Sequence, residues 1–317
     1  MFITPGAACA VLCLSALASA QVPKQTPAEP PSAKHALELA KSGHCREALP
    51  LLKKSAAANA NKDIKREVGF AGVRCAMFVN QADTAIDFLR VLNSEFPHDP
   101  DVLYLSVHTY SDLSTRASAE LADSAGNSYQ AQQLNAEALE IQGKWDDAAK
   151  VYRAILQQNP SLPGIHYRLG RVLVSKPGFG AAEAEQAKQE FEKELEIDPN
   201  NAGAEFVLGE MAKQNQQWEE ALHHFSQAAK IDAGFGDAFV GWGGALVSLK
   251  KFSEAIAPLE TAVKLQSANP AAHYLLAIAY ARSGRKEEGD REFEIQRRLT
   301  QKGAAGEAPA ESQASPN

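Results

Sequence analysis

One kind of local pattern is scarce in this chain of 317 residues. Alternating runs of Val, Ile and Thr, which are typical of half-buried β-strands, are hard to find anywhere. Proteins built on β-sheets are therefore disfavoured. The apolar residues are dominated by Ala and Leu, which lose little side-chain freedom in a helix. The composition predicts an all-helical protein.

The chain also lacks a surplus of positive charge. Its 32 Lys and Arg residues stand against 39 Asp and Glu residues, which gives a formal net charge of −7. General nucleic-acid binding needs a basic face that displaces counterions from phosphates, so we expect no nucleic-acid partner. The basic residues between Arg282 and Lys302 are interleaved with acidic ones and indicate a solvated helix face.

Motifs of catalysis and of cofactor binding are missing as well. The sequence has no His-Glu-x-x-His pattern, no Gly-x-Ser-x-Gly elbow and no Gly-rich phosphate loop. His223 and His224 are adjacent, and adjacent positions of a helix do not share a face, so this pair makes a poor metal site. We therefore expect no enzyme, no metal and no cofactor.

The first twenty residues contain no charged side chain. An apolar stretch there ends in Ala18-Ser19-Ala20, and small residues at these positions suit a signal peptidase. We expect residues 1–20 to be a signal peptide and the protein to be exported, either to the periplasm or out of the cell. Because no Lys or Arg precedes the apolar stretch, an uncleaved anchor formed by residues 1–20 remains an alternative. Membrane association is expected only in that case.

Against these absences, the chain contains an internal repeat of 34 residues. The pairs Leu208-Gly209, Trp242-Gly243 and Leu276-Ala277 recur at this spacing. In the second half of each unit a small residue is followed four positions later by a bulky one: Ala221 and Phe225, Ala255 and Leu259, Gly289 and Phe293.

This repeat resembles the tetratricopeptide repeat family over residues 129–302. Five units start near residues 129, 163, 202, 236 and 270. The second has extra residues at 175–180 that we expect to form a longer turn; the alternative is a contact loop. The resemblance implies an all-α, right-handed superhelical solenoid of antiparallel helix pairs. Each pair in such an array buries its apolar side against its neighbours. An amphipathic helix after Arg285 is expected to cap the last unit.

The rest of the chain is divided by the same pattern. Residues 34–128 resemble degenerate helix pairs, the last of them a shortened pair in residues 100–128 with Leu103, Val107 and Tyr110 on one helix face. The Pro-rich linker at 21–33 and the tail at 303–317 hold too few apolar residues to fold. In total we expect about eight pairs.

Two cysteines remain after removal of the expected signal peptide, Cys45 and Cys75. The repeat pattern places Cys45 at the start of a second helix and Cys75 late in the next first helix, on the same side of neighbouring antiparallel helices. We hypothesise a disulfide between them; the alternative is two buried free thiols. His166 and His273 fall at the fourth position of their units, where the family packs a large side chain, so we interpret them as partly buried core residues.

The family resemblance also implies which side chains face a partner, because the first helix of each pair lines the concave face. The candidate groove residues are Tyr104, Gln133, Glu137, Tyr167, Arg171, Phe206, Glu210 and Tyr274. Aromatic faces beside polar groups suit a bound peptide. The alternative is that the aromatic residues pack against the next repeat and only partly face the groove.

These observations predict a non-catalytic scaffold or adaptor of the bacterial cell envelope that binds a peptide or another protein in its groove. One alternative is a membrane-anchored subunit of an envelope assembly or secretion complex. A more remote alternative is a hydrolase of envelope polymers built on the same solenoid. Self-association is also an open expectation, because arrays of helix pairs often dimerise through an exposed end.

Overall fold

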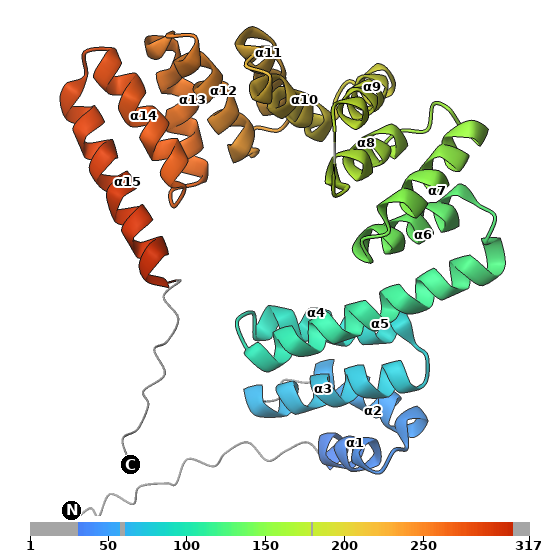
Figure 1. Ribbon diagram of the computed structural model, residues 1–317. Coiled ribbons are helices and arrows are strands. Elements are labelled where there is room, and N and C mark those ends of the chain that lie inside the picture. The colour runs from blue at the N-terminus through green and yellow to red at the C-terminus, as the bar shows by residue number, and fades with distance from the viewer. Residues whose placement is uncertain (1–30, 58–60, 179, 307–317) are drawn as a thin grey trace, which may run out of the picture. The chain divides into compact units, whose positions relative to one another are not determined.

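The computed structural model describes residues 31–57, 61–178 and 180–306, which hold fifteen α-helices and no strand (Figure 1). The all-α prediction is confirmed for this part of the chain. The expected signal peptide at 1–20 and most of the expected linker and tail lie outside the described residues. None of the helices described is both long and apolar enough to span a membrane.

The chain divides into two compact units, and the division falls between Ala119 and Glu120. Unit 1 contains two antiparallel pairs and most of a fifth helix. Its helices are α1 (Pro31–Lys41), α2 (Cys45–Ala57), α3 (Lys62–Phe78), α4 (Ala82–Glu95) and α5 (Pro100–Ala125).

The α5 helix corrects the prediction of a shortened pair, because residues 100–125 form one continuous helix. No Gly or Pro occurs between Pro100 and Gly126, so nothing breaks the helix over this stretch. Leu103, Val107 and Tyr110 do share a face, but it is the exposed face, at 48%, 65% and 49% exposure. The buried face of α5 instead carries Val102, Ser106 and Thr109.

Both ends of the helical region extend further than the sequence predicted. Helix α1 begins at Pro31 rather than after the expected linker, and Ala33 is buried in the core of unit 1. Proline is well suited to a first helical turn, since its missing N–H has no partner there in any case. Helix α15 continues to Gly306, past the expected start of the tail at residue 303, through the good helix formers Ala304 and Ala305.

Unit 2 contains the five pairs of the repeat. They are α6 (Tyr129–Ile141) with α7 (Trp145–Gln158), α8 (Ile165–Ser175) with α9 (Ala181–Ile197), α10 (Ala202–Gln214) with α11 (Trp218–Ile231), α12 (Gly236–Ser248) with α13 (Phe252–Leu265), and α14 (Pro270–Arg282) with α15 (Lys286–Gly306). Four first helices begin at the residues that the repeat pattern indicates, and α8 begins two residues later. The capping helix expected at the end is α15, the second helix of the last pair.

Glycines bring the helices of unit 2 close together around buried rings. Phe225 is fully buried between two first helices. A Cβ added at Gly209 of its own pair would lie 2.8 Å from the ring of Phe225, and one at Gly241 of the next pair would lie 2.6 Å from it. Such distances are too short for any side chain. The bulky residue of the second helix is therefore a ring packed against the glycine of the recurring Leu208-Gly209 pair in its own unit, and against Gly241 of the next unit.

The extra residues of the second unit lie between α8 and α9. The chain turns at Gly178, which has a positive φ of 81°, and α9 begins at Ala181. Lys176 forms an ion pair of 2.8 Å with Asp146 of the preceding pair. The insertion therefore links two neighbouring pairs as well as lengthening the turn.

Candidate functional site

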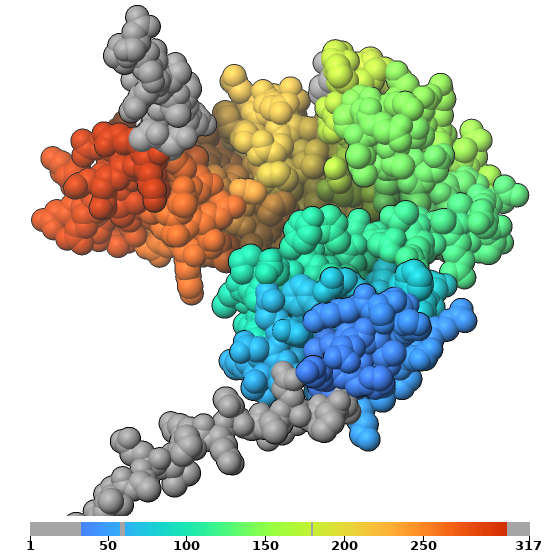
Figure 2. Space-filling view, turned by 90° about the horizontal axis from the view of Figure 1, so that it is seen from below, coloured from blue at the N-terminus to red at the C-terminus, as the bar shows by residue number. Residues whose placement is uncertain are grey.

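The first helices of unit 2 hold seven of the eight candidate groove residues. Figure 2 shows the successive pairs of this unit in contact along the array, from the green atoms of α6 and α7 to the red atoms of α15. The candidates lie on α6, α8, α10 and α14. We use the name first-helix face for the candidates on these four helices together with the side chains of the same helices that contact them. The candidates are Gln133, Glu137, Tyr167, Arg171, Phe206, Glu210 and Tyr274.

Two candidates on α6 lie together. The Gln133 side chain donates a hydrogen bond of 3.0 Å to Glu137. The same carboxylate forms an ion pair of 3.0 Å with Arg168 of α8. Sequence reasoning did not select Arg168; the signal that could have found it is the opposite charge one repeat away on the neighbouring first helix. This ion pair joins the first helices of two successive units.

Tyr167 and Arg171 form the second group, on α8. The guanidinium carbon of Arg171 lies 5.9 Å from the centre of the Tyr167 ring, within the range of a cation–π contact. The tyrosine ring is half-buried and packs 5.8 Å from the ring of Phe191. Its hydroxyl approaches Gly203 of α10 so closely that a Cβ there would lie 2.6 Å from the oxygen. Arg171 itself is exposed.

Phe206 of α10 is mostly part of the packing between repeats. Its ring centre lies 5.7 Å from that of Phe225 and 4.8 Å from that of Phe235. The neighbouring candidate Glu210 forms an ion pair of 2.6 Å with Lys213 of the same helix.

The four candidate aromatic residues are divided between the two alternatives. Tyr274 on α14 is 49% exposed and contacts Phe293 through a ring edge. Tyr104, on α5 of unit 1, is 69% exposed. Tyr167 and Phe206 are half-buried against other rings. Half of the aromatic set therefore offers a free ring surface, and the other half mainly joins repeats.

The histidines serve packing within the pairs. His166 contacts Glu190 at 2.5 Å through Nδ1, and the carbonyl of Pro160 at 3.0 Å through Nε2. His273 makes the matching contacts, 2.5 Å to Glu292 and 3.1 Å to the carbonyl of Ser267. Both histidines are buried. Each ties the first helix of its pair to the second.

The pair of α10 and α11 has the reverse arrangement, with the glutamate on the first helix and the histidine on the second. Nδ1 of His224 lies 2.6 Å from the carboxylate of Glu205. No group of three potential metal ligands occurs among the described residues.

Buried or paired side chains have shifted acidities. Burial, together with a hydrogen bond of 2.6 Å to Glu260, raises the pKa of Tyr280 to about 12. Burial and a hydrogen bond to Glu140 likewise raise the pKa of Tyr152. In unit 1, the guanidinium of Arg66 lowers the pKa of Asp99 to about 2. These groups keep one charge state across the neutral range, so they stabilise packing rather than transfer protons.

The structure joins Cys45 and Cys75 by a disulfide, with their Cα atoms 4.8 Å apart. This is the first of the two arrangements that the sequence left open. The bond connects the first residue of α2 to the last turn of α3, and both cysteines are buried.

Comparison with known proteins identifies the repeat. A family model described as tetratricopeptide repeat matches residues 130–172, and one described as TPR repeat matches residues 243–284. The chain contains tetratricopeptide repeats. A comparison with curated proteins finds no match.

Among solved structures, the chain is similar to a crystal structure of MamA protein, with 19% identity, a TM-score of 0.49 and coverage of 58% of this chain and 98% of that one. A structure of MamA from Desulfovibrio magneticus RS-1 is similar at 17% identity, with a TM-score of 0.48 and coverage of 55% and 96%.

Tetratricopeptide repeats generally mediate contacts between proteins and are typically non-catalytic. At this general level the chain is a protein-interaction scaffold. The first-helix face of its repeats is the candidate contact surface.

Proposed function

We propose that the protein is an exported, non-catalytic adaptor that binds a peptide or a segment of another protein on the first-helix face of unit 2. The observation that carries this proposal is the chemistry of that face. Tyr274 presents an exposed ring, and exposed Arg171 lies over the half-buried ring of Tyr167. Rings of this kind bury a large contact area at a low cost in rotamer entropy, and the cation can pair with a carboxylate or carbonyl of the bound chain.

The proposed mechanism is equilibrium binding. The glutamates of the face, Glu137 and Glu210, are paired with Arg168 and Lys213. Arg171 has no ion-pair partner among the described residues. A bound segment that carries a carboxylate near Arg171 would therefore gain an ion pair without breaking an existing one.

Two observations support export. The sequence of residues 1–20 has the character of a signal peptide, and disulfides such as Cys45–Cys75 persist mainly in oxidising compartments. The periplasm is the compartment we propose for a bacterial protein of this kind. Intact-mass measurement of the protein recovered from cells tests this proposal. A mature chain that begins at Gln21 supports export with cleavage, whereas a chain that retains residues 1–20 supports the anchored alternative.

The binding proposal is tested by crosslinking in the native envelope fraction, followed by identification of the captured protein. The test variant is Arg171→Ala with Tyr274→Ala, since both side chains are exposed and their loss leaves the core intact. The matched control is Arg153→Ala with Tyr129→Ala, an exposed arginine and an exposed tyrosine of the same unit outside the candidate set.

A partner captured by the wild type and by the control, but lost from the test variant, supports binding on the first-helix face. A partner captured equally well by both variants refutes it.

A further inference from the structure

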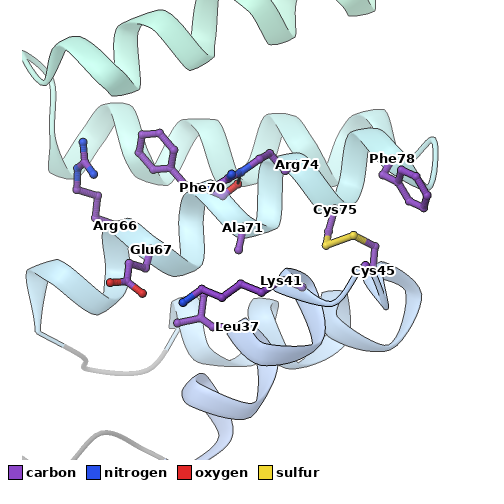
Figure 3. A pocket seen from close by; sticks show the side chains of 12 residues that line it. Leu37, Lys41, Cys45, Arg66, Glu67, Phe70, Ala71, Arg74, Cys75 and Phe78 are labelled. Carbon is purple, nitrogen blue, oxygen red and sulfur yellow. Dashed lines mark hydrogen bonds between the residues drawn. A yellow bond between two sulfur atoms is a disulfide. The ribbon is translucent and has the colours of Figure 1, made fainter.

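Unit 1 exposes apolar side chains in two places. The first is a pocket of about 620 Å³ between α1 and α3, where Ala40 and Ala71 leave space beside the Cys45–Cys75 disulfide (Figure 3). Its lining combines cations of both helices, the carboxylate of Glu67 and two phenylalanine rings, so it favours no single class of ligand. The second place is a face of α5 that carries no charged side chain.

Helix α5 is a first helix without a second helix of its own. The next helix along the chain, α6, begins the first pair of unit 2. On one side α5 packs against unit 1 through the buried Val102 and Ser106, and Asn93 of α4 donates a hydrogen bond of 3.2 Å to Ser106. The side that a second helix would cover in a complete pair therefore stays exposed.

This exposed side carries a row of residues with the spacing of a contact between two helices. The residues follow one another at alternating intervals of four and three: Leu103, Val107, Tyr110, Ser114, Ala117 and Leu121. Because a helix turns by about 100° per residue, they fall within a sector of about 80° of its surface. All of them except the partly exposed Leu121 are exposed. We call these six residues the α5 stripe.

Charged side chains are kept away from the α5 stripe. Helix α5 has five charged residues, and none of them falls in the sector of the stripe. The nearest, Glu120, lies about 60° away around the helix. Asp101 and Arg116 reach toward unit 1, where they contact Arg66 at 2.7 Å and Asn80 at 2.9 Å. Exposed aromatic and aliphatic side chains without charge are typical of the core of a protein interface, and a solvated helix face carries charge instead.

The α5 stripe is complementary to itself when two copies of α5 lie antiparallel. Pairing about its midpoint gives three kinds of layer: Leu103 with Leu121, Val107 with Ala117, and Tyr110 with Ser114. In two of them a large side chain meets a small one, so each copy fills the space that the small residues of the other leave open. Asp112, at the midpoint, lies on the opposite side of the helix, so its two copies do not face each other.

A second copy of the chain is the occupant that the sequence supports. Residues 307–317 contain no large apolar side chain, and residues 21–30 contain only Val22. Neither segment can supply a matching row of apolar residues, and residues 1–20 are the expected signal peptide. The α5 stripe is itself such a row, on a helix that is already formed.

We propose that the protein forms a homodimer in which the α5 helices of two copies pack antiparallel through the α5 stripe. Only Leu103, Val107 and Tyr110 are both large and exposed. The interface therefore falls at the small end of specific interfaces, below about 1,200 Å². The dimer dissociates in the micromolar range. This surface is separate from the first-helix face of unit 2 and does not depend on the function proposed for that face.

Sedimentation velocity over a range of concentrations tests the proposal with the full, disulfide-bonded chain. The two test variants are Val107→Lys and Ala117→Glu, at exposed positions that pair with each other across the dimer. The matched controls are Thr115→Lys and Ala119→Glu, at exposed positions of α5 outside the stripe. Circular dichroism checks that all four variants keep the helicity of the wild type.

The wild type and both controls should dimerise with the same affinity. Each test variant alone should dimerise at least about tenfold more weakly, because its homodimer buries two unpaired charges. A mixture of the two test variants should recover most of the lost affinity, since the introduced lysine of one chain then faces the introduced glutamate of the other.

Two results would overturn the proposal. One is a wild type that stays monomeric up to about 100 µM, a concentration at which even a small specific interface associates. The other is a dimer that neither test variant weakens, which would place the contact elsewhere on the chain. A mixture that associates no better than the separate test variants would refute the antiparallel pairing of position 107 with position 117.

Discussion

The carboxylate of Glu194 caps the start of helix α8 from a distance of 30 residues, accepting a hydrogen bond of 2.6 Å from the backbone N–H of Gly164. It accepts a second, of 3.1 Å, from the N–H of Tyr167. Glu194 is completely buried in α9, and Gly164 cannot cap its own helix with a side chain. A buried glutamate of the second helix therefore supplies the N-cap hydrogen-bond acceptor that an Asn or Ser side chain supplies at other helix starts.

Replacing Glu194 by Gln should destabilise unit 2 by about 1–3 kcal/mol, because an amide has only one acceptor oxygen and would leave a buried N–H without a partner. Urea unfolding followed by circular dichroism measures the change. Glu196→Gln, at an exposed position of the same helix, is the control and should stay within about 0.5 kcal/mol of the wild type. Equal midpoints for the two variants would contradict the capping role.

Two adjacent glycines of α12 should respond in opposite directions to the same substitution. A Cβ at Gly243 would overlap the side chain of Leu259, whereas a Cβ at Gly244 would meet its nearest neighbour, Leu275, at an ordinary 3.5 Å. Gly243→Ala should destabilise by about 1–3 kcal/mol through overpacking. Gly244→Ala should stabilise by up to about 1 kcal/mol, the difference in helix propensity. Thermal unfolding of both variants provides the test, and the same sign for both would refute the packing argument.

The disulfide of unit 1 should contribute substantially to stability, because it joins residues that are 30 apart in sequence. The chain-entropy relation gives about 3–4 kcal/mol for a loop of this length. We expect the double variant Cys45→Ser with Cys75→Ser to unfold at correspondingly lower urea concentration. A reducing agent should lower the stability of the wild type and leave the variant unchanged. A wild type that is insensitive to reduction would show that the bond contributes little.

Unit 1 should lose stability in acid partly through Asp99. Arg66 donates hydrogen bonds of 2.8 Å and 3.2 Å to its carboxylate and lowers its pKa from 3.8 to about 2. Because the folded-state pKa is the lower one, this contribution is complete above pH 3.8 and disappears as the pH falls toward 2.

Asp99→Asn should make the dependence of stability on pH shallower in this window. The amide oxygen of Asn can still accept the hydrogen bonds that Asp99 accepts from the backbone N–H groups of Asp101 and Val102 at the start of α5. The exposed Asp87→Asn provides a control. An unchanged slope in the Asp99 variant would contradict the role of this ion pair.

The repeat pattern predicted most of the helical architecture because its signals are local. Gly209 and Phe225 fall sixteen residues apart in one repeat, and the structure packs them together. The turn residues and small-residue positions likewise predicted four of the five first-helix starts. In residues 100–128, where the repeat pattern is weak, the prediction of a shortened helix pair was wrong. Residues 100–125 contain no helix-breaking residue after the first position and form a single helix. The apolar stripe of Leu103, Val107 and Tyr110 correctly indicated one face but not whether that face is buried.

The candidate groove residues were predicted less completely than the fold. Position in the repeat indicates which helix carries a residue such as Phe206 or Tyr274. Its exposure depends on the neighbouring side chains. Phe206 lies between Phe225 and Phe235 and is half-buried, whereas Tyr274 has a contact mainly on one edge and stays exposed.

The sequence alone determined that the chain is helical, that its helices pair with a period of 34 residues, and at which positions of each unit small and bulky residues recur. These features depend on helix propensity and on packing repeated in every unit, which leave a periodic trace. The tertiary structure alone decided the contacts that occur only once. Glu194 caps α8, and two alanines open a pocket beside the disulfide between α1 and α3. Such contacts depend on which groups folding brings together and shields from water, and they have no counterpart in the spacing of residues along the chain.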